Sequence, residues 1–108
     1  MRLAHRREEE AVYTSGVWLV KQGREDDFAR RWQESANAVA LDHANVKFML
    51  LRDRENPRRF LSLGEGWRNQ EQIDAARSTP SFQDSMASIW RLLESGEMST
   101  CDLVAEIS

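Results

Sequence analysis

The side chains able to perform acid–base, nucleophilic or metal chemistry are few in this sequence, and they lie far apart. The histidines are His5 and His43, and the single cysteine is Cys101. None of the three has a second ligand or a base at the spacing of a metal site or of an activated nucleophile. The five glycines form neither a dinucleotide-binding fingerprint nor a phosphate loop. We therefore expect no metal site and no bound cofactor.

His43 is the only histidine near the part of the chain that we expect to fold. It lies in the connection between an expected helix and the next strand. Because imidazole titrates near neutral pH, His43 is a candidate general base that could take a proton from a phenol. An exposed loop histidine without a catalytic role fits the same position, and the sequence leaves both interpretations open.

Aromatic side chains are the stronger chemical feature. Four tryptophans in 108 residues is a high number, and such side chains dominate a small core and any pocket within it. Trp67 ends an expected strand, where its indole N–H could donate to a carbonyl or phenolate oxygen; packing at the strand end is the alternative. Trp18, beside Gly16, fits a core, an interface or a pocket. Five residues of the expected helices can either pack the core or line a pocket: Phe28, Trp32, Phe82, Met86 and Trp90.

Hydrophobic periodicity and turn residues divide the chain into the elements that must position these side chains. Asn69 is the expected N-cap of one helix, and Thr79 with Pro80 opens another. On the third strand, Leu61, Leu63 and Trp67 are expected on one face, and its two glycines suggest a bulge or a close approach. The expected strands are 12–20, 46–52, 59–67 and 98–107, and the expected helices are 24–41, 69–77 and a last one from 80 to a stop at Gly96.

This order, β-α-β-β-α-α-β, is the split βαβ pattern of an α+β, ferredoxin-like sandwich of two layers. We expect residues 11–108 to form this domain and residues 1–10 to be a charged N-terminal tail. Helices would cover one face of the sheet, whereas the other face carries apolar side chains that nothing in the chain is left to cover. Such a face marks an interface, so we expect a homodimer whose two sheets pack together.

Composition limits the other partners. The net charge is −3 without a block of basic residues, which argues against nucleic acid or an anionic membrane as the main partner. No stretch is long and apolar enough to span a membrane, and the N-terminus lacks the apolar run of a signal peptide. With a single cysteine, the sequence predicts a cytoplasmic, reduced protein.

Four short motifs follow one another along the chain. They are the strand–turn–helix start over 15–23, Leu51-Arg52-Asp53 with Glu55-Asn56-Pro57, Gly66-Trp67, and the helix start Pro80-Ser81-Phe82. In this order and spacing they resemble the antibiotic biosynthesis monooxygenase family of the dimeric α+β barrel superfamily. The resemblance covers about residues 12–107, and it implies that Trp67 lines a pocket between the sheet and the helices.

The resemblance also implies a reaction. The family includes cofactor-free oxygenases of phenolic polyketides, quinol oxygenases and haem-degrading enzymes. Ser15-Gly16 stands where the haem-degrading branch has an asparagine, and Met86 stands where it has its histidine haem ligand. We therefore expect a cofactor-independent monooxygenase that uses O2 on small aromatic, quinol or polyketide-type substrates. Trp67 would orient the substrate, and His43 would be the base.

Two other functions fit the same fold. One is a non-catalytic ligand-binding or accessory dimer. The other is a cyclase or isomerase, which would convert a substrate without consuming O2. A cofactor-free oxygenase needs only a bound electron-rich ring, a polar group that stabilises its anion, and exclusion of bulk water. Aromatic walls and polar groups of this kind would serve all three functions.

Overall fold

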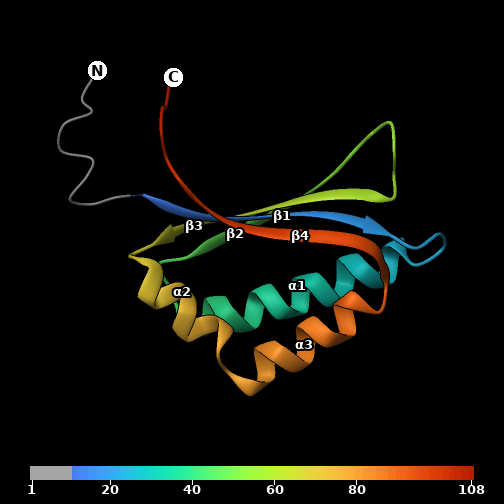
Figure 1. The fold of residues 1–108 in the computed structure, drawn as a ribbon, viewed down its shortest axis with the longest axis horizontal. Helices are drawn as coiled ribbons and strands as arrows, with labels where there is room; N and C mark the ends of the chain where they lie inside the picture. Colours follow the sequence, from blue (N-terminus) through green and yellow to red (C-terminus); the bar gives the residue numbers. More distant parts are fainter. Residues whose placement is uncertain (1–10) are drawn as a thin grey trace.

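Seven elements make up the fold of residues 11–108, which are the residues that the computed structural model describes. The strands are β1 Val12–Val20, β2 Lys47–Arg52, β3 Arg59–Trp67 and β4 Leu93–Asp102, and the helices are α1 Glu25–Asp42, α2 Gln70–Arg77 and α3 Pro80–Trp90 (Figure 1). The predicted order of elements is confirmed. The predicted charged tail, residues 1–10, lies outside the described residues.

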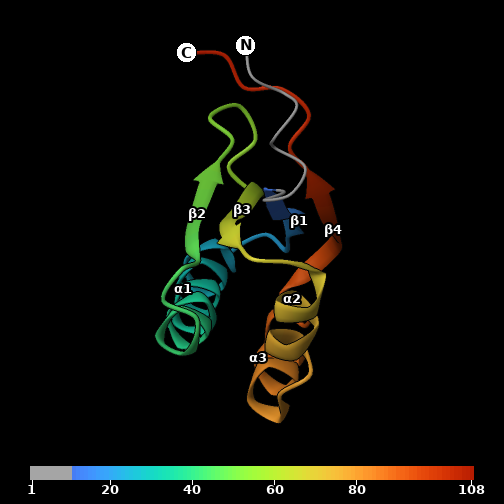
Figure 2. The ribbon, with the colours of Figure 1, turned by 90° about the vertical axis from the view of Figure 1, so that its left-hand side faces the viewer.

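One antiparallel sheet carries helices on a single face. Its strand order is β2-β3-β1-β4, so β1 pairs with both β3 and β4. Figure 2 shows α1 beneath the β2 side of the sheet and α2 with α3 beneath the β4 side. This two-layer arrangement confirms the predicted α+β, ferredoxin-like fold.

Capping side chains determine where α2 and α3 begin. Asn69 Oδ1 accepts a hydrogen bond from the backbone N–H of Gln72 at 2.9 Å, and Thr79 Oγ1 accepts one from the N–H of Phe82 at 3.1 Å. Pro80 opens α3, at a position where its missing N–H costs nothing. Both predicted caps are confirmed, and they separate α2 from α3 at residues 78–79.

Two clusters of buried side chains form the core between the sheet and the helices. In the larger cluster Phe28 is fully buried, and its ring lies 4.9 Å from that of Phe60. The larger cluster contains Trp18, Val20, Phe28, Phe60, Ile89, Leu92 and Leu93. The smaller cluster contains Val12, Val46, Trp67, Ile73 and Ala76. Because each cluster includes one strand tryptophan, the clusters place two indoles at different ends of the covered face.

The last strand begins earlier than the sequence pattern predicts. Helix α3 ends at Trp90, because the chain then turns so that the Leu92 carbonyl accepts a hydrogen bond from the N–H of Lys21 at 2.8 Å. Strand β4 starts directly after this contact, at Leu93, and ends at Asp102. The expected strand over 98–107 is therefore wrong at both ends.

Gly96 was expected to stop the last helix, and that expectation is wrong as well. It lies inside β4, opposite Trp18. A Cβ atom at Gly96 would press on the rings of Trp18 and Trp90. The glycine therefore makes room for two indoles within a strand.

A bulge in β3 reverses the face of its last residue. Between Gly64 and Trp67 this strand has one residue more than β1 has opposite it. Gly66 accommodates the bulge at a φ of 93°, a left-handed conformation that favours glycine. Trp67 is expected on the face of Leu61 and Leu63, but the extra residue turns its side chain toward the helices, where it is 6% exposed. The suggested bulge is confirmed, and the expected face of Trp67 is wrong.

The sheet face without helices, here called the open face, carries aliphatic side chains. They include Val17, Met49, Leu51, Leu61 and Leu63 from the three strands β1 to β3. Leu51 is 55% exposed and Val17 is 41% exposed. The hairpin between β2 and β3 and the C-terminal segment both rise on this side (Figure 1). The second apolar face predicted from the sequence is therefore present, and no helix of residues 11–108 covers it.

Candidate functional site

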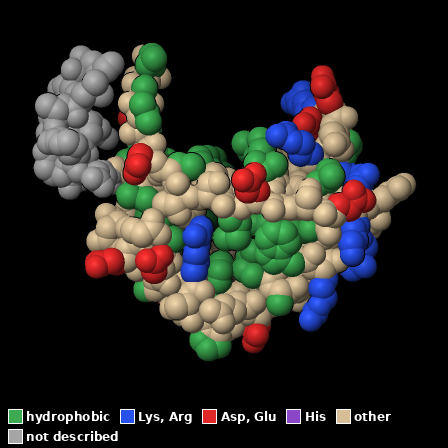
Figure 3. All heavy atoms as spheres, in the orientation of Figure 1, with side chains coloured by type: hydrophobic (Ala, Val, Ile, Leu, Met, Phe, Trp, Pro, Cys, Tyr) green, Lys and Arg blue, Asp and Glu red, His purple; other side chains and the backbone are tan. Residues whose placement is uncertain are grey.

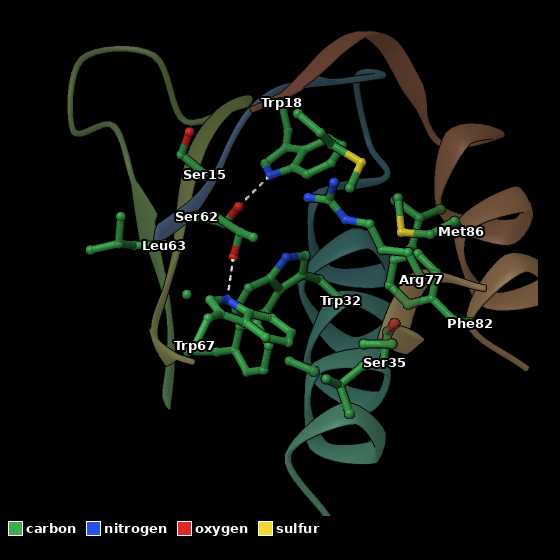
Figure 4. Close-up of a pocket in the computed structure, with 18 residues that line it drawn as sticks. Ser15, Trp18, Trp32, Ser35, Ser62, Leu63, Trp67, Arg77, Phe82 and Met86 are labelled. Carbon is green, nitrogen blue, oxygen red and sulfur yellow. Dashed lines mark hydrogen bonds between the residues drawn. The ribbon is translucent and has the colours of Figure 1, made fainter. Parts of the chain in front are cut away.

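A cavity of about 80 Å³ lies between the sheet and the helices. It separates the two core clusters, since Trp18 belongs to one cluster and Trp67 to the other. Figure 3 shows hydrophobic side chains in a hollow between the sheet and the helices. The apolar walls of the cavity come from strands and helices alike, namely Trp18, Trp32, Phe48, Trp67, Phe82 and Met86 (Figure 4). Such a concave, aromatic-walled space is the usual form of a small-molecule site.

Two indoles on neighbouring strands each donate to a hydroxyl of the other strand. Trp18 Nε1 on β1 donates to Ser62 Oγ on β3 at 3.0 Å, and Trp67 Nε1 on β3 donates to Thr14 Oγ1 on β1 at 3.1 Å (Figure 4). Each hydroxyl keeps its own hydrogen, and within residues 11–108 neither donates it to another group. Both hydroxyls line the cavity. On the sheet side of the cavity, the hydroxyls of Thr14 and Ser62 are therefore free to donate to a bound molecule, whereas the indole N–H of Trp67 is already engaged.

Two glycines make room for this arrangement. A Cβ atom at Gly16 would collide with the Trp18 indole, including its Nε1. A Cβ atom at Gly64 would collide with Thr14 Oγ1 and crowd the ring of Phe48. A larger residue at either position would displace a ring or a hydroxyl that lines the cavity.

Arg77, the last residue of α2, is the one charged residue in the cavity lining. Figure 4 shows its guanidinium directed into the cavity, toward the indoles of Trp18 and Trp32. Burial lowers the pKa of the Arg77 guanidinium, and the Asp74 carboxylate opposes this shift. Asp74 itself accepts a hydrogen bond from Gln70 at 2.9 Å. Among the described residues, the half-buried guanidinium has no hydrogen-bond or ion-pair partner.

A hydrogen-bonded network beside Trp67 joins the α1–β2 connection to the bulge and to α2. Gln72 Nε2 lies 3.2 Å from His43 Nδ1 and donates to Asn45 Oδ1 at 2.9 Å. Asn45 Nδ2 in turn donates to the Gly66 carbonyl at 2.7 Å. Because an amide nitrogen can only donate, His43 Nδ1 is the acceptor. The His43 ring lies against Trp67 with centroids 6.1 Å apart, so the network supports the tryptophan from outside the cavity.

The structure brings some of the predicted site residues together and separates others. Trp18, Trp32, Trp67, Phe82 and Met86 all line the cavity. The other three lie outside its lining. Phe28 is buried in the larger core cluster, Trp90 is 42% exposed and packs edge-on against Trp18, and His43 lines a separate cavity between α1 and α3.

Sequence reasoning missed Thr14, Ser62 and Arg77. A signal existed for the two hydroxyls, because strand alternation places Thr14 on the face of Trp18 and Ser62 on the face of Phe60. Arg77 gave no such signal, since a basic residue in the last turn of a helix is expected for its favourable interaction with the helix dipole. Only the tertiary structure shows that its side chain turns inward.

Metal ligands do not gather in the part of the chain that the structure describes. No three His, Cys, Asp or Glu side chains of residues 11–108 lie close enough together to hold a metal ion. Over the same range, no helix has the length and apolar character needed to cross a membrane.

A comparison with protein families decides the relationship. The family model described as antibiotic biosynthesis monooxygenase matches residues 12–88, which run from β1 into α3. The chain belongs to the antibiotic biosynthesis monooxygenase family. The resemblance seen in the sequence is thereby confirmed. All the residues that line the cavity in this family member lie within the matched range, apart from Ile89 and Met98.

Solved structures show how widely the fold of this monooxygenase family member is shared. A variant of SnoaB, a cofactor-independent oxygenase from Streptomyces nogalater, matches with a TM-score of 0.75 and 17% identity over 91% of this chain and 95% of the other. A conserved protein from Methanosarcina mazei Go1 matches with a TM-score of 0.76 and 15% identity over 88% and 94%. No match to a curated protein was found. At these identities the likeness establishes the fold alone.

Proposed function

We propose that this chain is a cofactor-independent monooxygenase that binds a small, oxygen-bearing aromatic ring and promotes its oxidation by O2. The observation that carries the proposal is the cavity, with its aromatic walls and two free hydroxyl donors, in a member of a monooxygenase family. The shared fold with SnoaB, a cofactor-independent oxygenase, supports the same conclusion.

The reaction asks little of the protein, because an ionised phenol is itself the reductant. One oxygen atom of O2 becomes a carbonyl on a ring carbon, and the other atom leaves as water. The hydrogen of that carbon and the phenolic hydrogen both end in the water molecule, so a phenol and O2 give a quinone and H2O. All four electrons come from the ring, and no second reductant is needed. The protein must bind the ring, stabilise its anion and exclude water.

The described residues provide groups for these tasks. Trp67 and Trp32 would form walls for the ring, and the hydroxyls of Thr14 and Ser62 would donate to a ring oxygen. Trp67 would act through its face and through its hydrogen bond to Thr14. His43 lies outside the cavity, so we assign it a positioning role on Trp67. The phenolic proton would pass to solvent, and solvent would return one proton to the oxygen atom that leaves as water.

One observation favours the alternative of a ligand-binding or accessory protein without catalysis. The cavity lining contains neither a histidine nor a carboxylate, and its single ionisable group is Arg77. No lining residue of the described chain can therefore serve as a conventional general base. A binding protein would need only the walls and the donors.

The proposal includes a second copy of the chain packed on the open face. The exposed aliphatic residues of β1 and β2, Val17, Met49 and Leu51, favour burial against another apolar surface. In a dimer with a two-fold axis through this face, the two sheets would pack against each other. Each cavity would then lie on the other side of its sheet, between that sheet and its helices.

Oxygen uptake tests the function. Purified, metal-stripped protein would be mixed with a panel of hydroquinones and anthrones while dissolved O2 is measured. We expect protein-dependent uptake, reduced at least tenfold in Trp67→Phe after correction for the folded fraction. Trp90→Phe makes the same chemical change outside the cavity and is expected to keep most of the uptake.

The result also separates the alternatives. If no compound of the panel causes uptake of O2 but binding is still visible as quenching of tryptophan fluorescence, the chain is a ligand-binding protein and not an oxygenase. Product formation without loss of O2 would indicate a cyclase or isomerase. Equal activity in Trp67→Phe and in the parent would show that the reaction does not take place in this cavity.

A further inference from the structure

We propose that the ligand of the cavity is an aromatic oxyanion, a carboxylate or phenolate paired with Arg77, whose opposite end carries an oxygen bound by Thr14 and Ser62. This inference rests on the proposed function for the location of the site, and it adds the charge and orientation of the ligand. Three observations support it: the unpaired guanidinium, the two free hydroxyls of the sheet, and the volume of the cavity.

No carboxylate of the described chain forms an ion pair with the guanidinium of Arg77, and Asp74, three residues earlier in α2, acts on it only at longer range. The guanidinium is half-buried against aromatic walls, and burial of an unpaired charge costs free energy. The lining provides no carboxylate, and Asp74 lies outside the lining and accepts from Gln70. An incoming oxyanion would supply the missing charge-assisted hydrogen bonds, for which the planar guanidinium is well suited.

The sheet wall of the cavity combines aromatic rings with two uncharged hydroxyls. Thr14 and Ser62 each accept one hydrogen bond from an indole, and accepting a bond polarises a hydroxyl so that it donates more strongly. A hydroxyl or carbonyl oxygen of the ligand could receive one or both of these hydrogens. The two walls therefore prefer different groups, which gives the ligand a direction.

The size of the cavity limits the ligand between the two walls. About 80 Å³ is more than one water molecule needs, and it is less than the roughly 150 Å³ of an apolar cavity that accepts benzene. A single ring would enter after a modest shift of a flexible side chain, such as the unbranched Met86 or Met98 of the wall. We therefore expect a one-ring ligand, with any further part of the molecule reaching solvent.

Binding measured without turnover tests this inference. Quenching of tryptophan fluorescence would give the Kd of 4-hydroxybenzoate and of its neutral methyl ester, each at low and high salt. Absorbance would follow 4-nitrophenol, whose phenolate and phenol forms both exist near neutral pH. We expect the parent protein to bind 4-hydroxybenzoate at least tenfold more tightly than the ester, and to prefer nitrophenolate over nitrophenol.

Variants test which side chains cause the preference for the charged ligand. Arg77→Met should abolish the difference between acid and ester, and Arg77→Lys should retain part of it. Arg68→Met removes the same charge from an exposed position outside the lining and should retain all of it. At the other wall, Ser62→Ala and Thr14→Val should weaken 4-hydroxybenzoate more than benzoate, because only the former carries the second oxygen.

Each result bears on the inference without depending on catalysis. Equal affinity of the parent for acid and ester together with equal affinity for nitrophenolate and nitrophenol, or absence of binding by all four, would overturn it. Equal effects of Arg77→Met on the charged and the neutral member of each pair would overturn it as well. A preference for 4-hydroxybenzoate alone would identify the anion as a carboxylate, and a preference for nitrophenolate alone would identify it as a phenolate. Oxygen uptake without a preference in either the acid–ester pair or the phenolate–phenol pair would leave the oxygenase intact and reject the oxyanion.

Discussion

The two faces of the sheet are built from the same four strands, yet they use different side chains. On the covered face, large rings alternate with very small residues, as with Trp18 beside Gly16 and Phe48 beside Gly64. On the open face, medium-sized aliphatic side chains gather on β1 to β3, whereas β4 presents small and polar residues such as Ser95, Glu97 and Ser99. Pairing large with small residues leaves a shaped space with polar groups at fixed places, whereas similar aliphatic chains form a broad surface. The proposed ligand site and the proposed dimer surface thus differ in the variation of side-chain size along a strand.

The largest effect is expected at the bulge of β3, which turns Trp67 to the covered face. In Gly66→Ala the new Cβ would collide with the backbone carbonyl of Asn45, and the positive φ would be strained as well. We expect the free energy of unfolding to fall by about 3 kcal/mol or more. Urea denaturation would measure it.

Gly23→Ala is the matched control for this substitution. Gly23 has a similar φ of 85°, but a Cβ atom there meets nothing within 4 Å. Its loss should be about 1 kcal/mol, the cost of the left-handed conformation alone. Equal losses in the two variants would show that the close approach to Asn45 contributes nothing.

The next largest effect is expected at the open face, and it concerns the mass of the protein in solution rather than its folding. The double substitution Val17→Glu with Leu51→Glu places two charges on exposed positions of this face. Light scattering should then fall from about twice 12.5 kDa to 12.5 kDa, because the apolar contact is lost. Leu41→Glu, at an 85% exposed position near the end of α1, should leave the mass unchanged. A parent protein that is already monomeric at micromolar concentration would contradict the proposed dimer.

The crossed indole–hydroxyl pairs provide a smaller effect on the covered face. Thr14→Val removes the acceptor of the Trp67 indole N–H and leaves that donor unpaired beside the cavity. We expect a loss of about 1 kcal/mol in the free energy of unfolding, while Thr14→Ser should recover most of it. Thermal unfolding of the three proteins would show the order, and identical melting temperatures for valine and serine would mean that the hydrogen bond adds no stability.

The smallest effect is expected in the β2–β3 hairpin, which rises beyond the open face. The N–H groups of Glu55 and Asn56, followed by the Arg59 guanidinium, lower the pKa of the Asp53 carboxyl. Because the pKa of Asp53 is lower in the folded state, its carboxylate stabilises the folded hairpin at pH values above about 4, the ordinary pKa of an aspartate. This stabilisation is lost as the pH falls through the lower pKa of the folded state. Asp53→Asn should therefore be slightly less stable at pH 7, and the difference should vanish at about pH 2. A constant difference across this range would refute the role of the charge.

The elements that follow local rules could be predicted from the sequence. Asn69 and Thr79 cap helices because their side chains replace missing intrahelical partners, a matter of a few neighbouring residues. The start of β4 depends instead on a contact between Leu92 and Lys21, which are far apart in sequence. Gly96 therefore resembled a helix stop, although in the structure it provides space for two indoles.

The candidate site was predictable in kind but not in geometry. The aromatic content and the resemblance pointed to a pocket with Trp67, and Trp67 does line the cavity. Its expected face was wrong, because strand alternation has a period of two residues and one extra residue reverses it. The burial of Phe28, the exposure of Trp90 and the inward turn of Arg77 depend on how the helices pack, which periodicity within a single helix does not determine.

The bulge at Gly66 has a consequence for the ways in which this gene can change. Loss of the single codon for Gly66 would restore regular alternation between Gly64 and Trp67, and it would leave the Trp67 side chain opposite Val12 on the covered face. A substitution at Gly66 that abolished the bulge but kept the extra residue would instead turn the Trp67 side chain to the open face. The wall that Trp67 forms can therefore survive the deletion of one codon more easily than a change of its meaning.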